Sequence, residues 1–231
     1  MSPQIIFIEG NIAVGKSTIL NALAEAETTL NIQCIFEPVD TWQNLKDSTG
    51  KNLLDLFYSD MKRYAYSFQS YAFLSRARMF DAIDMTADII FVERSVFADK
   101  EIFATNCYKQ GIMTEIEWLL YNDWFTWMIP KCIPNLPSSI VYLQCPPELC
   151  KERLNTRNRS EEASVSLEYL QTIHDRHEEW LNTDPTICKA ILNAKLPIDV
   201  LKGHILELVT KMVKGRQFTV REVFDLSIAS C

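Results

Sequence analysis

The stretch GNIAVGKST, from Gly10 to Thr18, follows directly on an apolar run that covers residues 5–8. Its G-x-x-x-x-G-K-S spacing, placed between a strand and a helix, is typical of a phosphate-binding loop. The glycines allow a tight turn in which successive N–H groups point at phosphate oxygens. Lys16 adds a cation for the terminal phosphates and Ser17 a hydroxyl for Mg²⁺. A glycine-rich turn that opens an ordinary helix is the alternative, which the preceding strand disfavours.

This loop predicts a nucleoside triphosphate as a ligand, because the helix after it also contributes an electropositive N-terminus. A second basic segment, RLNTRNR at 153–159, follows a later apolar stretch. Its arginines could form a solvated charged loop, but in an acidic protein they favour a grip on triphosphate oxygens. The predicted nucleotide-binding residues are Gly10, Asn11, Ala13, Gly15, Lys16, Ser17, Thr18, Arg153, Arg157 and Arg159.

The overall charge limits which partners are plausible. The chain has 231 residues, with 23 Lys and Arg against 30 Asp and Glu, and a formal net charge of −7. Such a charge disfavours non-specific binding to nucleic acid or to a membrane surface, because both are anionic. We therefore expect small-molecule ligands held by local basic clusters, with no nucleic-acid partner and no membrane partner.

Cysteine usage and the N-terminus bear on the compartment. The seven cysteines are scattered, form no C-x-x-C pair and lack histidine partners at metal-ligand spacing, which is typical of reduced thiols inside a cell. The first apolar segment begins almost at once, so we expect no presequence. No apolar run reaches the ~18 residues of a membrane span. We expect a cytoplasmic protein.

Short apolar segments alternate with helical patterns along the chain. The expected strands cover 4–9, 33–37, 89–93 and 140–144, with a weaker one at 196–200. The expected helices cover 17–26, 53–59, 64–85, 100–109, 115–128, 147–155, 167–182 and 204–214. This order predicts an open parallel α/β sheet of about five strands with helices on both faces. With only six glycines and no repeat, we expect one domain over 1–214 and an added element of unknown role over 215–231.

Ligands of such sheets lie outside the carboxyl ends of the strands. Glu37 follows the second expected strand, and Glu93 and Arg94 end the third. Either acid alone could be a surface residue of a loop. Phosphoryl transfer to an alcohol, however, needs a carboxylate that orients and deprotonates the hydroxyl, an acid that engages Mg²⁺ and a cation that offsets developing charge. We predict these three roles for Glu37, Glu93 and Arg94.

Several segments, in order along almost the whole chain, resemble the deoxynucleoside kinases. They are GNIAVGKST (10–18), EPVDTW (37–42), NLLDLFYSD (52–60), FQSYAFLSRAR (68–78), ERSVFADKEIF (93–103), EWLLYNDW (117–124) and RLNTRNRSEEASVSLEYL (153–170). The resemblance implies a P-loop kinase fold with an arginine-rich lid. It also implies ATP, or another nucleoside triphosphate, as donor, Mg²⁺ as cofactor, and 5′-phosphorylation of a deoxyribonucleoside in nucleotide salvage. It further implies a homodimer.

The resemblance also carries residue roles. Glu37 corresponds to the general base near the 5′-hydroxyl, with Arg94 beside it, and Glu93 to the acid that engages Mg²⁺ together with Ser17. Because the family's proton acceptor has also been described at the position of Glu93, both acids are kept as catalytic. The implied nucleoside contacts are Tyr58 and Glu162 at the sugar 3′-hydroxyl, Gln69 at the base edge, and Trp42, Phe68 and Phe103 as walls around the base.

Base preference depends on Arg76 and Asp99, which resemble the pair in family members that take deoxycytidine and purine deoxynucleosides. Such a pair leaves less room for a thymine methyl, although it could also be a structural salt bridge.

A thymidine-preferring or broad-specificity kinase is the alternative function, followed by a thymidylate-type nucleotide kinase and an inactive nucleotide-binding regulator. A carboxylate at Glu37 disfavours a monophosphate acceptor, because it would repel the incoming phosphate. One departure from the family is Asn158, where relatives often have glycine.

Overall fold

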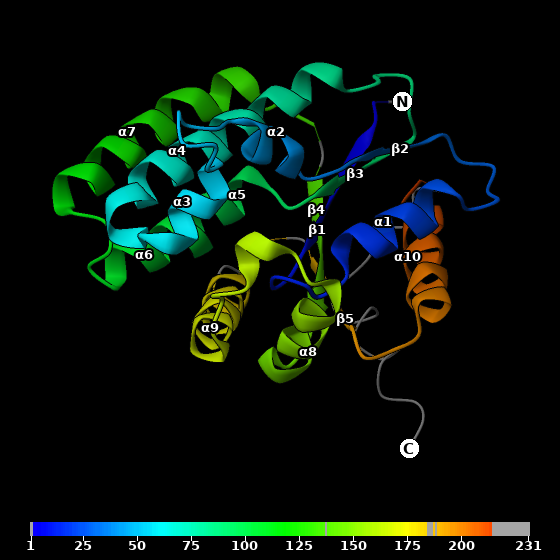
Figure 1. Cartoon of the computed structure of the whole chain (residues 1–231). Coiled ribbons are helices and arrows are strands. Elements are labelled where there is room, and N and C mark those ends of the chain that lie inside the picture. Colours follow the sequence, from blue (N-terminus) through cyan, green and yellow to red (C-terminus); the bar gives the residue numbers. More distant parts are fainter. Residues whose placement is uncertain (1, 137, 184–186, 188, 214–231) are drawn as a thin grey trace.

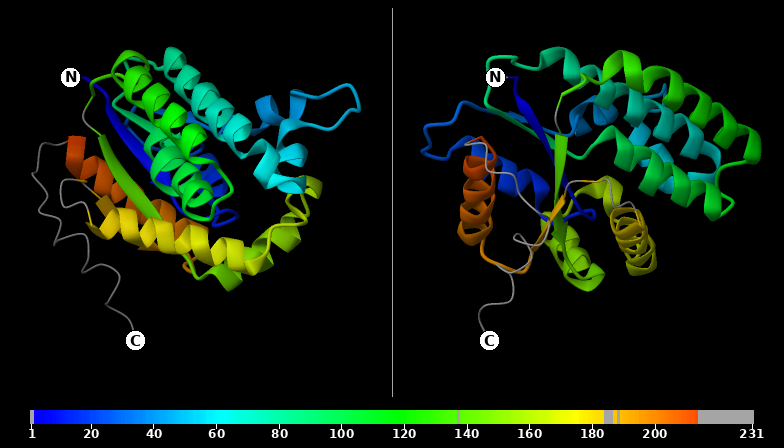
Figure 2. Two further views of the ribbon diagram at one scale, coloured as in Figure 1. Left: turned by 90° about the vertical axis from the view of Figure 1, so that its left-hand side faces the viewer. Right: turned by 180° about the vertical axis from the view of Figure 1, so that it is seen from behind.

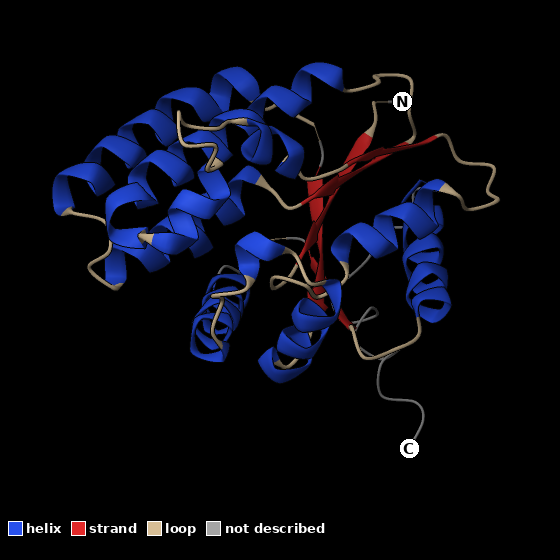
Figure 3. Cartoon of the chain, in the orientation of Figure 1, coloured by secondary structure: helices blue, strands red, loops and turns tan. Residues whose placement is uncertain are grey.

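The computed structural model describes residues 2–136, 138–183, 187 and 189–213. Its centre is a five-stranded sheet with the strand order β2-β3-β1-β4-β5. All pairings between neighbouring strands are parallel. The strands are β1 (Gln4–Glu9), β2 (Ile32–Ile35), β3 (Ile89–Glu93), β4 (Ser138–Gln144) and β5 (Lys189–Asn193). Figure 3 shows the sheet enclosed between helices, which explains why its central strands read as continuous apolar runs.

Helices cover both faces of the sheet (Figures 1 and 2). Alternate side chains of a strand point to opposite faces. Ile6 and Ile8 of β1 therefore pack in one core, and Ile5 and Phe7 pack in the other. The first core is closed mainly by α1 (Lys16–Ala24), α8 (Pro147–Arg157), α9 (Leu167–Thr183) and α10 (Ile198–Val213). The second is closed mainly by α3 (Leu53–Ser59), α4 (Met61–Arg78) and α7 (Glu115–Cys132).

Shorter elements join these helices to the strands. They are α2 (Val39–Asn44), a 3₁₀ turn η1 (Met79–Ala82), α5 (Val96–Ala98), a π-helix η2 (Asp99–Ala104), α6 (Thr105–Lys109) and a 3₁₀ turn η3 (Ser160–Glu162). The expected helix over 64–85 therefore ends earlier, and the one over 100–109 begins as a π-helix. The short helix α2 is not among the helices expected from the sequence. The predicted doubly wound α/β sheet is confirmed.

The expected strand over 196–200 is wrong. The fifth strand is β5, which pairs with β4 from Ile140↔Lys189 onward. Residues 198–200 instead form the first turn of α10, where the carbonyl of Pro197 accepts from the N–H groups of Val200 and Leu201 at 3.1 Å each. Proline suits the start of a helix because its fixed φ is compatible with helical geometry and its missing N–H has no partner there anyway.

The described elements, as far as residue 213, form one sheet with two covering layers, and the domain boundary at 214 stays a prediction. The expected extension over 215–231 lies outside the described residues. Among the helices that the structure describes, none combines the length and the apolar character needed to cross a bilayer.

Candidate active site

A cavity of about 860 Å³ opens at the carboxyl edge of the sheet. It is lined by residues that follow β1, β2 and β3, together with side chains from α4, η2 and the segment after α8. Nearly all of the predicted site residues line it, namely Ala13, Gly15, Lys16, Ser17, Thr18, Glu37, Trp42, Tyr58, Phe68, Gln69, Arg76, Glu93, Arg94, Asp99, Phe103, Arg153, Arg157, Arg159 and Glu162. Gly10 and Asn11, the other two, instead contribute to the structure of the phosphate-binding loop.

Gly10 and Asn11 fix the shape and position of the phosphate-binding loop. Gly10 has a φ of 146°, and a Cβ atom there would lie 2.8 Å from the carbonyl oxygen of Leu143. A side chain at this position is therefore excluded both by conformation and by space. Asn11 donates from Nδ2 to the carbonyl of Leu170 at 2.8 Å, and its Oδ1 accepts from the N–H of Ile12 at 2.8 Å. These contacts connect the loop to α9.

Lys16 lies over this loop rather than in solvent. Its Nζ donates to the carbonyl oxygens of Gly10 at 3.2 Å and Asn11 at 3.0 Å. Burial and the nearby Arg94 lower the pKa of Lys16 to about 8, although neighbouring carboxylates oppose this shift. An anion in the cavity would favour the charged form of the lysine.

Ser17, in the first turn of α1, and Glu93, the last residue of β3, are brought together. The Ser17 hydroxyl donates to Glu93 Oε1 at 2.7 Å, and Glu93 Oε2 accepts from the N–H of Glu37 at 3.4 Å. A hydroxyl and a single carboxylate fit Mg²⁺, which prefers oxygen ligands and is commonly completed by substrate phosphates and water. Accordingly, the described residues contain no cluster of three His, Cys, Asp or Glu side chains that could hold a metal alone.

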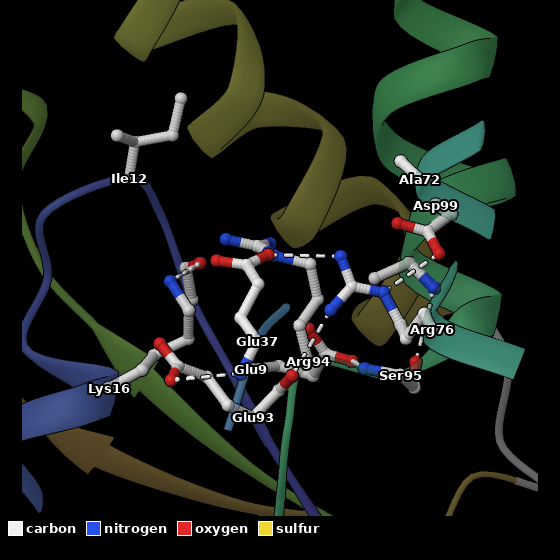
Figure 4. Close-up of polar contacts among 12 residues, drawn as sticks. Glu9, Ile12, Lys16, Glu37, Ala72, Arg76, Glu93, Arg94, Ser95 and Asp99 are labelled. Atoms are coloured by element: carbon white, nitrogen blue, oxygen red, sulfur yellow. Dashed lines mark hydrogen bonds and ion pairs between the residues drawn. The ribbon is translucent and has the colours of Figure 1, made fainter. Parts of the chain in front are cut away.

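Two guanidinium groups meet at Glu37 (Figure 4). Its Oε1 accepts from Arg76 Nη2 at 2.9 Å and from Arg94 Nε at 3.1 Å. Burial alone would raise the pKa of Glu37, but Arg94, Arg76 and Lys16 together lower it to about 2. The carboxylate is therefore ionised at neutral pH.

Arg76 also binds Asp99, as the sequence suggested. Its Nε lies 2.9 Å from Asp99 Oδ2, and both side chains are almost fully buried. Burial raises the pKa of Asp99, against the pull of the guanidinium. Arg76 additionally donates from Nη1 to the carbonyl of Glu93 at 3.2 Å. The pair is thus both a buried ion pair and part of the cavity wall.

Aromatic side chains form one end of the cavity. Phe68 lies edge-on to Trp42, with ring centroids 5.4 Å apart, and stacks on Phe57 at 4.5 Å. Beside them, the buried Gln69 amide is within 4.0 Å of the sulfur of Cys107, a weak hydrogen-bond partner. Phe57 and Ala72 line the cavity but were missed by the sequence analysis. A signal for Ala72 exists, since 68, 72 and 76 recur every four residues on one face of α4.

The arginines after β4 divide into two groups. Arg157 and Arg159 both contact Glu162, the latter at 3.1 Å. Arg153 instead donates to the carbonyl oxygens of Val14 at 2.6 Å and Ala194 at 2.8 Å, so it braces the phosphate-binding loop.

Asn158 lies between these arginines and ends α8 in the left-handed region, with a φ of 51°. Asparagine adopts this conformation more readily than most residues other than glycine. The departure from glycine at this position therefore preserves the local backbone geometry.

Comparison with known proteins agrees with this geometry. The profile of the family described as deoxynucleoside kinase matches residues 6–217. Deoxycytidine kinase of Mus musculus is 39% identical over 195 residues, which cover 76% of this chain and 74% of the mouse protein. Deoxycytidine kinase of Homo sapiens is 38% identical, with the same shares covered. Mitochondrial deoxyguanosine kinase of Xenopus laevis is 36% identical over 203 residues, which cover 80% of this chain and 76% of that protein.

These matches confirm the resemblance noted from the sequence motifs. They span most of the chain, and the parallel sheet with its phosphate-binding loop is the fold expected of such a kinase. The chain therefore belongs to the deoxynucleoside kinase family, whose members transfer a phosphoryl group from a nucleotide to a deoxynucleoside.

Proposed function

We propose that this enzyme uses ATP·Mg²⁺ to phosphorylate the 5′-hydroxyl of deoxycytidine or a purine deoxynucleoside. The observation that carries the proposal is the position of Glu37, whose Oε1 is held by Arg76 and Arg94 in the same cavity as Lys16. An ionised carboxylate can orient an incoming hydroxyl and accept its proton. The names of the relatives, deoxycytidine and deoxyguanosine kinase, support the same acceptor class.

In the proposed reaction the 5′-hydroxyl donates a hydrogen bond to Glu37. The 5′-oxygen forms a bond to the γ-phosphorus while the bond from that phosphorus to the β–γ bridging oxygen breaks, and ADP leaves. A carboxylate with so low a pKa is a weak base, so the proton moves to Glu37 late, when bond formation has made the hydroxyl acidic. Arg94 and Lys16 offset the charge on the transferred group.

Ser17 and Glu93 would hold Mg²⁺ together with oxygens of the donor. The 2.7 Å contact between their side chains supports this role. Held there by Ser17 and Glu93, Mg²⁺ would supply positive charge against the negative charge of the donor phosphates. Glu93 remains a catalytic residue in this proposal.

The donor phosphates would bind the backbone of 10–18, Lys16, and the lid arginines Arg157 and Arg159. Arg153 would support donor binding mainly through its contact with Val14. Glu162, which both lid arginines contact, would bind the sugar 3′-hydroxyl together with Tyr58. After burial, Glu162 is the largest influence that raises the pKa of Tyr58, which supports their proximity.

The nucleoside base would lie against the aromatic walls of the cavity. Trp42, Phe68 and Phe103 would enclose the ring. Gln69, whose amide nitrogen has the Cys107 sulfur as a weak partner, would hydrogen bond to its edge. Arg76 and Asp99 would then exclude a thymine methyl.

We further propose a homodimer formed through α7. Large apolar side chains on this helix are exposed, among them Ile116 at 62%, Leu119 at 55% and Trp127 at 56%. A group of apolar residues of this size on one helix is typical of a protein interface. Sedimentation of the Trp127→Glu variant tests this proposal, because the variant should sediment as a monomer.

We also propose a cytoplasmic location, which the five free cysteines among the described residues support.

A radiolabel transfer assay tests the proposed reaction. The four deoxynucleosides and their monophosphates are each incubated with γ-labelled ATP and Mg²⁺, with the Lys16→Ala variant as the blank. We expect label on deoxycytidine and the purine deoxynucleosides, less on thymidine, and none on the monophosphates. Label on the monophosphates alone would show that the acceptor is a nucleotide.

A further inference from the structure

Glu9, the last residue of β1, has a buried carboxyl group to which the proposed reaction assigns no role. Its side chain is 0% exposed. Oε1 accepts from the N–H of Ser95 at 2.7 Å, whereas Oε2 is buried and has no hydrogen-bond partner among the residues that the structure describes. Burial raises the pKa of this carboxyl, and Arg94 opposes the shift. Buried carboxyl groups that lack full hydrogen bonding are costly, so this one calls for an explanation.

The contact with Ser95 belongs to the turn that follows β3. Arg94 in this turn has a φ of 64°, a left-handed conformation that is uncommon for residues other than glycine. Two bonds fix the turn from consecutive residues of β1. The N–H of Arg94 donates to the carbonyl of Ile8 at 3.0 Å, and the N–H of Ser95 donates to Glu9. Of the two acceptors in this pair of hydrogen bonds, only the Glu9 carboxyl is a side-chain group and can be changed by substitution.

The turn carries Arg94 and precedes the short helix that leads to Asp99, the ion-pair partner of Arg76. On one side, Arg94 reaches Glu37 Oε1 and places its Cζ 4.5 Å from the ring centre of Phe103. On the other side, Ser95 Oγ accepts from the N–H of Ala98 and so caps α5, the helix that leads directly into Asp99. Figure 4 shows Glu9 and Ser95 joined by a dashed line below the Arg94 side chain.

We propose that Glu9 is a positioning residue for phosphoryl transfer. Its carboxyl oxygen holds the turn at Ser95, and thereby keeps Arg94 against the catalytic carboxylate of Glu37. This inference rests on the proposed function, because Arg94 and Glu37 are assigned their roles there. Strained backbone that is fixed by surrounding contacts is common at functional sites, where it places a side chain in advance of the reaction.

Two substitutions separate the hydrogen bond from the rest of the side chain. Glu9→Gln keeps both the size and an oxygen acceptor for the Ser95 N–H. Glu9→Met has a similar length, but it provides no oxygen. Ile8→Val is the matched control, because it removes a methylene from the neighbouring core position and leaves the turn untouched. Melting temperatures of all three variants establish that the measurements are made on folded protein.

We expect Glu9→Met to lower kcat by about 10²-fold, the usual cost of a misplaced catalytic group. Titration with ATP and with the deoxynucleoside should give dissociation constants close to those of the wild type. The acid limb of the kcat profile should also move to higher pH, because a displaced Arg94 no longer lowers the pKa of Glu37. Glu9→Gln and Ile8→Val should keep most of the wild-type kcat and the wild-type pH profile.

The proposal is overturned if folded Glu9→Met turns over like Ile8→Val, or if Glu9→Gln is as impaired as Glu9→Met. The second result would mean that the charge of the carboxyl matters and not its bond to Ser95. These outcomes are distinct from failure of the proposed function, which would appear as a wild-type enzyme that transfers no phosphate to deoxynucleosides.

Discussion

Arg76 Nη2 lies 2.9 Å from Oε1 of Glu37, so a residue predicted to select the base also contacts the predicted catalytic carboxylate. The same guanidinium binds Asp99 through Nε. The proposed base selection and the proposed acid–base chemistry therefore involve one buried side chain. Substitutions at Arg76 should change both properties, and the two effects can be measured separately.

The first prediction concerns base selection. Arg76→Met combined with Asp99→Ala should raise the ratio of kcat/KM for thymidine to that for the best native substrate, because the wall beside the base is opened. Arg76→Met alone leaves the buried Asp99 carboxylate without its ion-pair partner, at a cost of about 3–5 kcal/mol, whereas Asp99→Ala leaves Arg76 paired with Glu37. The double variant should therefore melt at a higher temperature than Arg76→Met. An unchanged ratio would show that the pair does not determine specificity.

A second prediction concerns the pH profile of Arg76→Met. Arg76 is one of three cations that lower the pKa of Glu37 to about 2. Its removal should raise that pKa toward the usual value for glutamate. Since the proposed general base must be ionised, the acid limb of kcat should move to higher pH, whereas Asp99→Ala, which keeps the guanidinium, should shift it much less. Identical acid limbs in wild type and Arg76→Met would contradict the electrostatic role of Arg76.

The third prediction concerns Lys16, whose pKa is lowered to about 8. Donor phosphates bind the protonated amine, so the dissociation constant for ATP should rise above pH 8, by about tenfold for each pH unit, until the pKa of the complex is reached. Lys16→Arg should show a flat profile over this range, because arginine stays protonated. Isothermal titration over pH 7–10 provides the measurement. A rise of equal size in Lys16→Arg would assign the effect to another group.

The phosphate-binding loop and four of the five strands could be predicted because each is a short local pattern. The loop follows from the spacing of Gly10, Gly15 and Lys16, and the strands from continuous apolar runs. β5 was missed because its run from Lys189 to Asn193 is only half buried and carries little contrast with its flanks. The apolar residues at 196 and 198 offered a competing strand, although Pro197 begins a helix there.

Contacts between distant residues could not be predicted in the same way. Nothing local at Arg76 indicates that its guanidinium reaches Glu37, which is 39 positions away. The spacing of Arg153 and Arg157 suggested one shared role, but Arg153 donates to the carbonyl of Val14 whereas Arg157 contacts Glu162. The left-handed backbone at Arg94 carries no sequence signal at all, because it is imposed by β1.

The measurement that tests the account most directly is single-turnover transfer by Glu37→Gln, with saturating ATP·Mg²⁺ and deoxynucleoside. The amide keeps the size of the side chain but does not accept the proton, and loss of a general base costs about 10²–10⁴-fold in rate. We predict a loss of this size with little change in the dissociation constant for the nucleoside. Glu168→Gln, at an exposed position of α9, should react like the wild type. Wild-type turnover by folded Glu37→Gln would show that Glu37 is not the base.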